Sequence, residues 1–319
     1  MTKILFCGTP EFAGTILAAL HENGYPVMAV LTQPDKPKGR GNKLTPPPVK
    51  VYAEAHGIPV FQPETLKNGA FDRMMKILDP DLAVVAAYGK ILPASFLRYP
   101  RLGCVNVHGS LLPRYRGAAP IQRCLIDGET GTGVTIMKMD EGLDTGDMLL
   151  KRTTPITEED DFGSLHDRMA SLGAKALLEA MPGILDGTIA AEKQDDSLSN
   201  YAKKIEKEDT LLDFTEPAAA LAHRIMGLSP VPLAVCLHNG QPLKLARAKT
   251  GRPDGIHGAP GEVLSLKSGI IEIACGEGTL LVTELLPAGK KRMRSADYIN
   301  GRKIAVGDRF LTPEKEIDN

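Results

Sequence analysis

The 319-residue chain contains no tryptophan, and aromatic residues make up only 5% of it. A nucleic-acid surface on this protein would therefore rely on charge and shape more than on bases stacked against aromatic rings. The cysteines are odd in number and form no CxxC pair, which argues against a disulfide framework or a zinc ribbon and favours reduced thiols. They are Cys7, Cys104, Cys124, Cys236 and Cys275.

Long apolar segments are also absent. No apolar run approaches the roughly 18 residues that a membrane-spanning helix needs, and residues 1–7 lack the long apolar segment and cleavage site of a signal peptide. We therefore expect a soluble, cytoplasmic protein without a membrane contact. Lys and Arg total 38 against 39 Asp and Glu, a net charge of −1, so any surface that binds a polyanion must be local.

Several familiar catalytic motifs are missing as well. Residues 8–14 read Gly-Thr-Pro-Glu-Phe-Ala-Gly, which is not the GxGxxG of a nicotinamide-binding turn. The sequence around Gly89-Lys90 lacks the rest of a P-loop, and no GxSxG nucleophile motif occurs. The seven histidines show no HExxH spacing, so we expect no metal site.

The first half of the chain alternates short apolar runs with helical patterns. Because strands that alternate with helices favour a parallel sheet covered by helices, we expect an α/β, Rossmann-like wound, mostly parallel sheet. A long helical pattern over 162–185 ends this predicted domain, which spans 1–188, and a polar linker follows over 189–208. The predicted strands are 3–7, 27–31, 60–61, 82–87, 104–108 and 134–139.

The last third has a different pattern. A helix is predicted over 218–228, directly after Pro217, a residue suited to the first turn of a helix. Five short β-like runs follow over 233–237, 243–248, 262–266, 270–275 and 280–286, separated by turn pairs such as Asn239-Gly240. They predict a smaller, OB-like β-barrel domain over 209–319.

The most informative stretch is 104–121. Asn106 and His108 are two residues apart on a predicted strand, so both point to one face at the strand end where wound sheets bind ligands. On the pair alone, a ligand site and a self-satisfied polar strand end are equally compatible with the sequence. The loop that follows, with two leucines before Pro113, offers an apolar wall beside a ligand. A carboxylate from the acidic loop 140–147, which by itself reads as a solvated turn, would favour a protonated His108.

Two segments are cationic. Residues 34–50 carry five basic side chains and one acid in a Pro- and Gly-rich stretch, which predicts a long, irregular, cationic loop. Residues 286–303 carry six basic side chains and one acid. Each segment is compatible with a solvated surface or with contact to a polyanionic partner.

Taken together, several segments resemble the methionyl-tRNA formyltransferases, a family that uses 10-formyltetrahydrofolate. The resemblance covers nearly the whole chain, and its most specific part is the run Asn-Val-His-Gly-Ser-Leu-Leu-Pro at 106–113 with an aspartate downstream. One departure is the stretch 229–233, Ser-Pro-Val-Pro-Leu, where relatives often carry a tryptophan. The matching segments are 6–12, 39–41, 87–93, 106–113, 140–147 and 287–293.

The resemblance implies transfer of a formyl group from 10-formyltetrahydrofolate to the methionine of initiator methionyl-tRNA, without a metal and by a monomer. It implies catalytic roles for Asn106, His108 and Asp144. A formyltransferase for a sugar nucleotide or another small amine, and a non-catalytic RNA-binding module, are the two alternatives. The implied folate-contacting residues are Ser110, Leu111, Leu112, Pro113, Tyr88, Gly89, Ile91 and Leu92, and the implied tRNA-contacting residues are Arg40, Lys38, Lys43, Lys290, Lys291 and Arg292.

Overall fold

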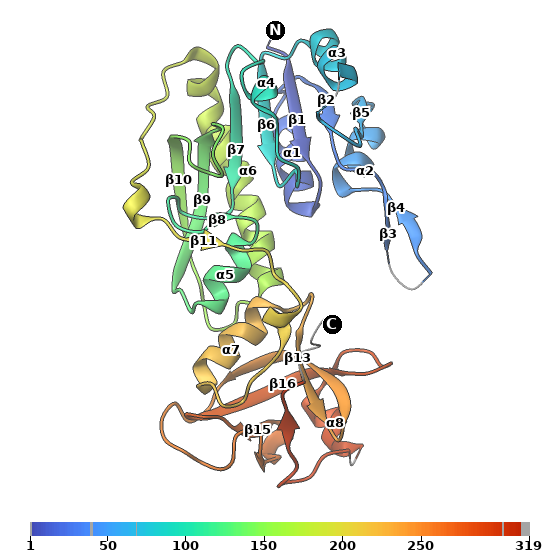
Figure 1. The fold of residues 1–319 in the computed structure, drawn as a ribbon, viewed down its shortest axis with the longest axis vertical. Helices are drawn as coiled ribbons and strands as arrows, with labels where there is room; N and C mark the ends of the chain where they lie inside the picture. Colours follow the sequence, from blue (N-terminus) through green and yellow to red (C-terminus); the bar gives the residue numbers. More distant parts are fainter. Residues whose placement is uncertain (1, 39–40, 68, 302, 314–319) are drawn as a thin grey trace. The chain divides into compact units, whose positions relative to one another are not determined.

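The computed structural model describes residues 2–38, 41–67, 69–301 and 303–313. They form two compact units, each assembled from several stretches of the chain (Figure 1). The first unit comprises Met1–Gly117, Gly131–Thr154 and His166–Tyr201, and the second comprises Ala118–Thr130, Pro155–Leu165 and Ala202–Asn319. The contiguous boundaries that we predict from the sequence, 1–188 and 209–319 with a linker over 189–208, remain a prediction.

The first unit is built on a seven-stranded sheet with the order β10-β9-β7-β6-β1-β2-β5. Strands β5, β2, β1, β6 and β7 are paired in parallel, and β9 is antiparallel to β7, so the sheet is mostly parallel, as predicted. The strands are β1 (Ile4–Gly8), β2 (Val27–Leu31), β5 (Val60–Phe61), β6 (Leu82–Ala86), β7 (Cys104–His108), β9 (Gly131–Lys138) and β10 (Met148–Pro155).

Helices cover this sheet because its central strands are buried throughout. On one face, Leu5, Cys7 and Cys104 pack with Phe71 and Phe96 from two of the helices. Side chains alternate along a strand, so the intervening residues of β1 and β7 face the opposite side. The helices of this unit are α1 (Glu11–Glu22), α2 (Pro48–Ala55), α3 (Gly69–Leu78), α4 (Ala94–Leu97) and most of α6 (Phe162–Asp186).

The strand order reverses between β1 and β6. The chain runs from β1 outward to β2 and β5, and then crosses to β6 and β7 on the other side of β1. Wound sheets bind ligands at the carboxyl ends of the strands beside such a reversal. The register pairs Gly8 with Ala86 and Val85 with Asn106, so His108 lies at the level of the residues that leave β1 and β6.

The cationic segment 34–50 differs from our expectation of an irregular loop. It contains a two-stranded antiparallel hairpin, β3 (Lys36–Lys38) and β4 (Lys43–Thr45), with Pro37 paired to Leu44. The prediction was wrong because a proline is tolerated on an edge strand, where its missing N–H does not interrupt a ladder. The turn uses Gly41 and Asn42, which both have positive φ.

The second unit is built on an antiparallel sheet with the order β14-β15-β16-β13-β12-β18, with β17 paired to β16. An antiparallel bridge between Glu262 and Arg309 places β18 next to the start of β14, so the sheet curls back on itself. The five predicted strands are all present, and two-residue strands β17 and β18 add to them. The strands are β12 (Ala234–His238), β13 (Gln241–Thr250), β14 (Val263–Ser265), β15 (Ile271–Ala274), β16 (Thr279–Pro287), β17 (Met293–Arg294) and β18 (Phe310–Leu311).

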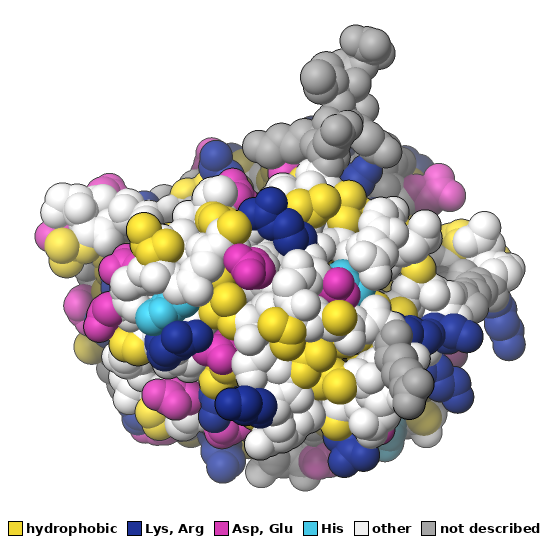
Figure 2. Space-filling model, turned by 90° about the horizontal axis from the view of Figure 1, so that it is seen from below, with side chains coloured by type: hydrophobic (Ala, Val, Ile, Leu, Met, Phe, Trp, Pro, Cys, Tyr) yellow, Lys and Arg dark blue, Asp and Glu magenta, His cyan; other side chains and the backbone are white. Residues whose placement is uncertain are grey.

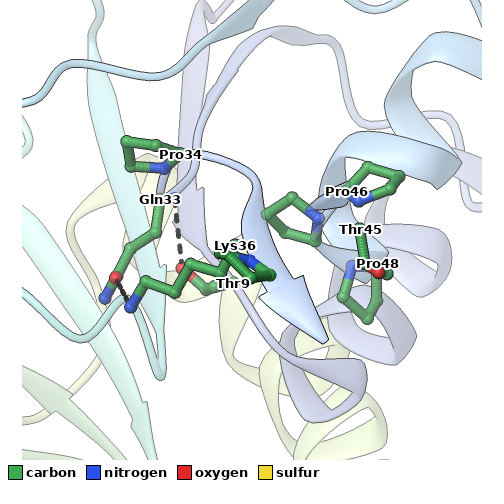
Figure 3. Close-up of a pocket in the computed structure, with 9 residues that line it drawn as sticks. Thr9, Gln33, Pro34, Lys36, Thr45, Pro46 and Pro48 are labelled. Carbon is green, nitrogen blue, oxygen red and sulfur yellow. Dashed lines mark hydrogen bonds between the residues drawn. The ribbon is translucent and has the colours of Figure 1, made fainter. Parts of the chain in front are cut away.

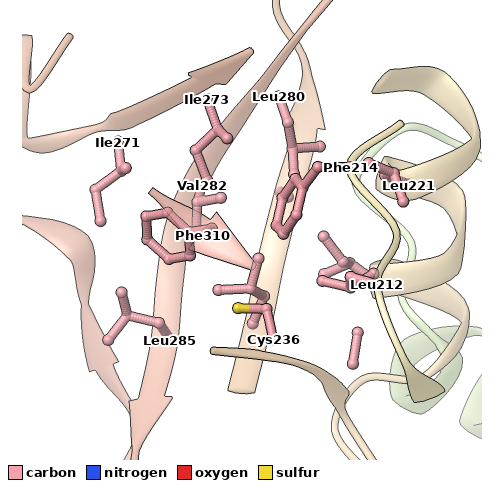
Figure 4. Packing of buried hydrophobic residues seen from close by; sticks show 14 of the residues in the cluster. Leu212, Phe214, Leu221, Cys236, Ile271, Ile273, Leu280, Val282, Leu285 and Phe310 are labelled. Carbon is pink, nitrogen blue, oxygen red and sulfur yellow. The ribbon is translucent and has the colours of Figure 1, made fainter. Parts of the chain in front are cut away.

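The core of this second unit fills the inside of the curled sheet. Phe214, Cys236, Ile273, Val282 and Phe310 converge there (Figure 4). Asn239 and Gly240 both have positive φ between the paired residues of β12 and β13, which is the two-residue hairpin turn that their sequence predicts. The arrangement is consistent with the OB-like domain we expect. Its helices are α5 (Pro120–Ile126), α7 (Ala218–Gly227) and α8 (Ser295–Asn300).

Short elements complete the description. β8 (Arg116–Gly117) pairs with β11 (Tyr201–Ala202), and three single-turn 3₁₀ helices lie at Asp196–Leu198, Glu208–Thr210 and Lys267–Gly269. Within the described ranges, no helix combines the length and the apolar character that crossing a bilayer requires.

Candidate active site

Asn106 and His108 lie on the same face of β7, at its carboxyl end. They are 9% and 5% exposed, respectively. Their backbone partners on β9 are Met137 and Thr135. Among the described residues, the Asn106 amide has no side-chain hydrogen-bond partner, so both of its donor hydrogens are available to a ligand.

Among the described residues, His108 uses one ring nitrogen in a hydrogen bond and leaves the other without one. Nε2 lies 2.9 Å from the carbonyl oxygen of Tyr115. A carbonyl oxygen only accepts, so Nε2 carries a hydrogen and donates it there. The other ring nitrogen, Nδ1, faces the Oδ2 of Asp144 at 3.7 Å. This separation is too long for a hydrogen bond, so the Asp144 carboxylate lies beside Nδ1 without binding it directly.

Asp144 is held in place through its side chain and its backbone. Its Oδ2 accepts the backbone N–H of Gly117 at 2.8 Å, and its φ of 55° lies in the left-handed region. Two residues later, Gly146 has no room for a side chain, because a Cβ there would lie 1.8 Å from the carbonyl oxygen of Lys138. The loop 140–147 is therefore folded toward β7 at Asp144 and is not merely a solvated turn.

The turn after β7 is tied to the neighbouring strand. The Thr135 hydroxyl donates to the carbonyl of Ser110 at 2.7 Å and accepts the N–H of Leu112 at 3.1 Å. Ser110 is fully buried, and its hydroxyl donates to the carbonyl of Arg114 at 2.6 Å. Leu112 packs inward against Met137 and Met148. Leu111 and Pro113 are half-buried, so these two present the apolar surface of the turn.

The residues that follow β6 likewise include buried side chains and exposed ones. The Tyr88 and Leu92 side chains belong to the core, and burial raises the pKa of the Tyr88 hydroxyl. Gly89 has a φ of 78°, while Ile91 is 87% exposed. Of this predicted group, Ile91 and the backbone around Gly89 are therefore the parts open to a ligand.

An open pocket of about 260 Å³ lies beyond β1 and β2 (Figure 3). The Gln33 amide donates to the carbonyl of Tyr88 at 3.0 Å, and the Lys36 ammonium donates to the Gln33 side-chain oxygen at 2.7 Å. With these polar groups already engaged, the pocket offers a mainly apolar surface. Its lining residues are Thr9, Gln33, Pro34, Lys36, Pro37, Thr45, Pro46, Pro47 and Pro48.

Comparison with known proteins places the chain in a family. The formyl transferase model matches residues 2–181, and the formyl transferase C-terminal domain model matches residues 204–303. A methionyl-tRNA formyltransferase from Pelobacter propionicus is 54% identical over 96% of this chain and 95% of its own length. One from Trichlorobacter lovleyi is 50% identical over 98% of both chains. The chain belongs to the methionyl-tRNA formyltransferase family.

Solved structures with lower sequence similarity share the fold of this formyltransferase. An N-formyltransferase from Helicobacter canadensis, solved with folinic acid and dTDP-3-aminofucose, has a TM-score of 0.66 at 18% identity and covers 88% of this chain and 99% of its own. HypX from Aquifex aeolicus, solved with tetrahydrofolic acid, has a TM-score of 0.64 at 18% identity and covers 99% of this chain and 50% of its own. The family and fold predicted from the sequence are thus confirmed.

The candidate site also includes residues that the sequence analysis did not predict. Gln194, inside the segment predicted to be a linker, is buried and donates to the carbonyls of Asp144 and Gly146 at 2.8 and 2.7 Å. Arg116 donates to the Gln194 side-chain oxygen, and the backbone oxygen of Asn200 accepts the N–H of Arg116 at 3.1 Å. No local motif marks these residues, because their partners are distant in sequence.

The predicted tRNA-contacting residues lie on surface turns where they can be placed. Lys43 is exposed on β4, and Lys290 and Lys291 are exposed between β16 and β17. Arg292 forms an ion pair with Glu284. Arg40 lies outside the described residues, as does the side chain of Lys38. On the face seen in Figure 2, basic and acidic side chains are interspersed. Within the described part of the chain, no group of three or more metal-ligating side chains is placed to hold an ion.

Proposed function

We propose that this protein transfers the formyl group of 10-formyltetrahydrofolate to the α-amino group of methionine on initiator methionyl-tRNA, for translation initiation. The observation that supports this most is that the Asn106 amide, which has no side-chain partner among the described residues, lies near the His108 imidazole and the Asp144 carboxylate at the carboxyl end of β7. The full-length similarity to methionyl-tRNA formyltransferases at 48–54% identity supports the choice of substrates.

The reaction needs a donor for a developing oxyanion. The neutral amine attacks the formyl carbon, a C–N bond forms, and the formyl oxygen becomes anionic before the bond to the folate nitrogen breaks. The Asn106 amide has two hydrogens without a protein acceptor among the described residues, so we assign it as the oxyanion donor. Such a donor contributes about 3 to 4 kcal/mol where water is excluded.

The proton path follows from the hydrogen bonds of His108. Because Nε2 is committed to the Tyr115 carbonyl, Nδ1 is the atom that gives up a proton. The attacking amine loses a proton and the leaving folate nitrogen gains one, so the reaction requires a group that can accept a proton and donate one. The Oδ2 of Asp144, 3.7 Å from Nδ1, places a negative charge beside this nitrogen.

We propose that the folate lies against the turns after β6 and β7. Half-buried Leu111 and Pro113 and exposed Ile91 supply apolar surface beside Asn106 and His108, which suits a planar ring system and its linker. The neighbouring members of the predicted set, Ser110, Leu112, Tyr88, Gly89 and Leu92, would then support this surface or contribute backbone contacts.

For the tRNA, we propose contacts from two cationic segments. The hairpin β3–β4 carries Lys38, Arg40 and Lys43 in sequence, and the β16–β17 turn carries Lys290, Lys291 and Arg292. Lysine and arginine side chains bind phosphates through charge and hydrogen bonds. A small-amine formyltransferase would need the same catalytic groups but would have no use for these segments.

We further propose that the enzyme acts in the cytoplasm, because its relatives are named for a step of translation, and that it acts as a monomer. Analytical ultracentrifugation of the purified protein checks the oligomeric state, with a single species near 34 kDa expected.

A direct assay tests the proposed function. Purified protein is incubated with 10-formyltetrahydrofolate and either charged initiator tRNA, an amino sugar nucleotide or methionine amide. We expect rapid formylation of the charged tRNA alone. Loss of transfer in His108→Ala and Asp144→Asn, with thermal unfolding unchanged, would support the assigned site. Preferred formylation of a small amine would reject the tRNA assignment.

A further inference from the structure

We propose that Gln194 is a positioning residue of this formyl-transfer site, an inference that rests on the proposed function. Its side-chain amide holds the loop that carries Asp144 in the conformation that places the Asp144 carboxylate beside His108. Gln194 touches neither the reacting atoms nor the predicted catalytic side chains, so it acts through the loop.

The contacts of the Gln194 amide span the critical part of the loop. Its nitrogen donates to the carbonyl of Asp144 at 2.8 Å and to the carbonyl of Gly146 at 2.7 Å. The two acceptors lie on either side of Thr145. Gln194 is only 6% exposed, so water cannot readily take over both contacts if the amide is removed.

Arg116 determines which end of the Gln194 amide faces the loop. The guanidinium Nε and Nη2 approach the Gln194 side-chain oxygen at 3.0 and 2.8 Å. A guanidinium only donates and a backbone carbonyl only accepts, so a flipped amide would face donors with donors and acceptors with acceptors. Nη2 also donates to the exposed carboxylate of Asp196 at 2.7 Å.

The loop needs an external restraint because of its backbone conformation. Asp144 has a φ of 55°, and residues other than glycine adopt the left-handed region at a cost in free energy. The nearby hydrogen bonds of Asp140, to the Gly142 N–H and the Thr145 hydroxyl, lie within the loop itself. Gln194 instead connects the loop to a separate segment of the chain.

The same contacts join the two groups that flank His108. Arg116 follows Tyr115, whose carbonyl accepts from His108 Nε2, and precedes Gly117, whose N–H donates to the Asp144 carboxylate. Gln194 therefore links the loop on the Nδ1 side of the ring to the strand segment on its Nε2 side. If the link is cut, the Asp144 carboxylate keeps its hydrogen bond from the Gly117 N–H, but the backbone on either side of Thr145 loses the restraint that Gln194 supplies.

The experiment measures kcat and KM for charged initiator tRNA and for 10-formyltetrahydrofolate in four proteins. They are wild type, Gln194→Ala, Asp144→Asn and the double variant. A displacement near 1 Å in a catalytic group costs about 10²-fold in rate, so we expect kcat of Gln194→Ala to fall about 10²-fold with both KM values within about twofold of wild type. In the Asp144→Asn background, the same change should cost less than about threefold, because the group it positions is already impaired.

Gln194→Glu separates the loop contacts from the contact to Arg116. Glutamate keeps the side-chain size and an acceptor for Arg116, but it cannot donate to the two carbonyls when ionised. We expect Gln194→Glu to lose as much kcat as Gln194→Ala. Full activity of Gln194→Glu would show that Gln194 serves Arg116 alone, and it would overturn the proposal. The exposed neighbour Lys193 supplies a matched control, Lys193→Ala, with wild-type kinetics expected.

Folding is checked by thermal unfolding of every variant. If Gln194→Ala does not fold, Arg116→Lys tests the positioning role instead. This change weakens the hydrogen bonds that orient the Gln194 amide but keeps the amide itself, so kcat should fall about tenfold at unchanged KM. If the fold-loss in kcat of the double variant equals the product of the losses in Gln194→Ala and Asp144→Asn, the positioning role is overturned. If wild type formylates methionyl-tRNA and Gln194→Ala is fully active, the role of Gln194 is rejected and the proposed function stands. If wild type does not formylate methionyl-tRNA, both the proposed function and the role of Gln194 are rejected.

Discussion

Truncation of Asn106 provides the sharpest test of the proposed chemistry. In Asn106→Ala we expect kcat to fall about 10²- to 10³-fold, since one oxyanion donor in a dry site is worth about 2.7 to 4 kcal/mol. The structure supports a loss in kcat of this full size. Asn106 is 9% exposed, so water replaces the lost donor poorly, and among the described residues no acceptor competes for its hydrogens.

The same change should leave stability almost untouched. No side-chain hydrogen bond within the described protein is broken, so we expect a loss of free energy of unfolding within about 1 kcal/mol. The adjacent residue Val107, buried on the opposite face of β7, gives a matched control. Val107→Ala should lose about 2 kcal/mol of stability while retaining most of its kcat.

The assay is single-turnover formylation of charged initiator tRNA at saturating folate, with thermal unfolding measured in parallel. Single-turnover conditions report the chemical step without product release. A folded Asn106→Ala protein that retains more than a tenth of the wild-type single-turnover rate would refute the oxyanion role.

Three other predictions follow from particular contacts. Leu112→Ala should lower the free energy of unfolding by about 2 to 3 kcal/mol, the lower part of the range for a buried leucine, as measured by urea denaturation. Replacing both Lys290 and Lys291 with Ala should weaken tRNA binding and reduce the slope of log affinity against log salt by about 1.5, because each phosphate contact contributes about 0.7 to 0.9. The hydrogen bonds from Arg123 lower the pKa of Asp209. Its carboxylate therefore stabilises the fold when the pH is above the usual aspartate pKa of about 4, and this stabilisation is lost as the pH falls through the lowered pKa. The difference in melting temperature between wild type and Asp209→Asn should accordingly be smaller at pH 3 than at pH 7.

Each of these has an outcome that would contradict it. An unchanged urea midpoint in Leu112→Ala would mean that its packing against Met137 and Met148 contributes little. For the lysines, exposed Lys175 and Lys193 serve as the matched pair, and equal salt slopes for both double variants would remove the specific tRNA contact. A difference in melting temperature between wild type and Asp209→Asn that is as large at pH 3 as at pH 7, or larger, would contradict the lowered pKa of Asp209.

Much of the fold could be predicted from the sequence because its central strands are continuously buried. The run 82–86 is apolar throughout, and the run 104–108 alternates apolar residues with Asn106 and His108. The turn pair Asn239-Gly240 has positive φ at both residues. The hairpin at 36–45 and the two-residue strands β17 and β18 could not be predicted, because they lack a hydrophobic period. β17 and β18 are defined by their pairing with β16 and β12, whereas β3 pairs with β4 in a separate two-stranded sheet.

The candidate site was predictable only in part. The two-residue spacing of Asn106 and His108 predicts a shared face, and the register of β7 confirms that geometry. The position of Asp144 came from the family resemblance, because its left-handed backbone and its contact with Gly117 have no local signature. Gln194 was missed for a related reason: it lies 50 residues from Asp144 in the sequence, and a single polar residue in a charged segment resembles a solvated one.

The most direct test of the account is transfer of a labelled formyl group from 10-formyltetrahydrofolate to methionyl-initiator tRNA by the purified wild-type protein. The matched control is the same tRNA with its methionyl amine blocked by acetylation. We predict that label appears on the free-amine tRNA, is released as formylmethionine by mild alkaline hydrolysis of the ester, and is absent from the acetylated tRNA. No transfer to the free-amine tRNA, or equal labelling of both, would contradict formyl transfer to the α-amino group.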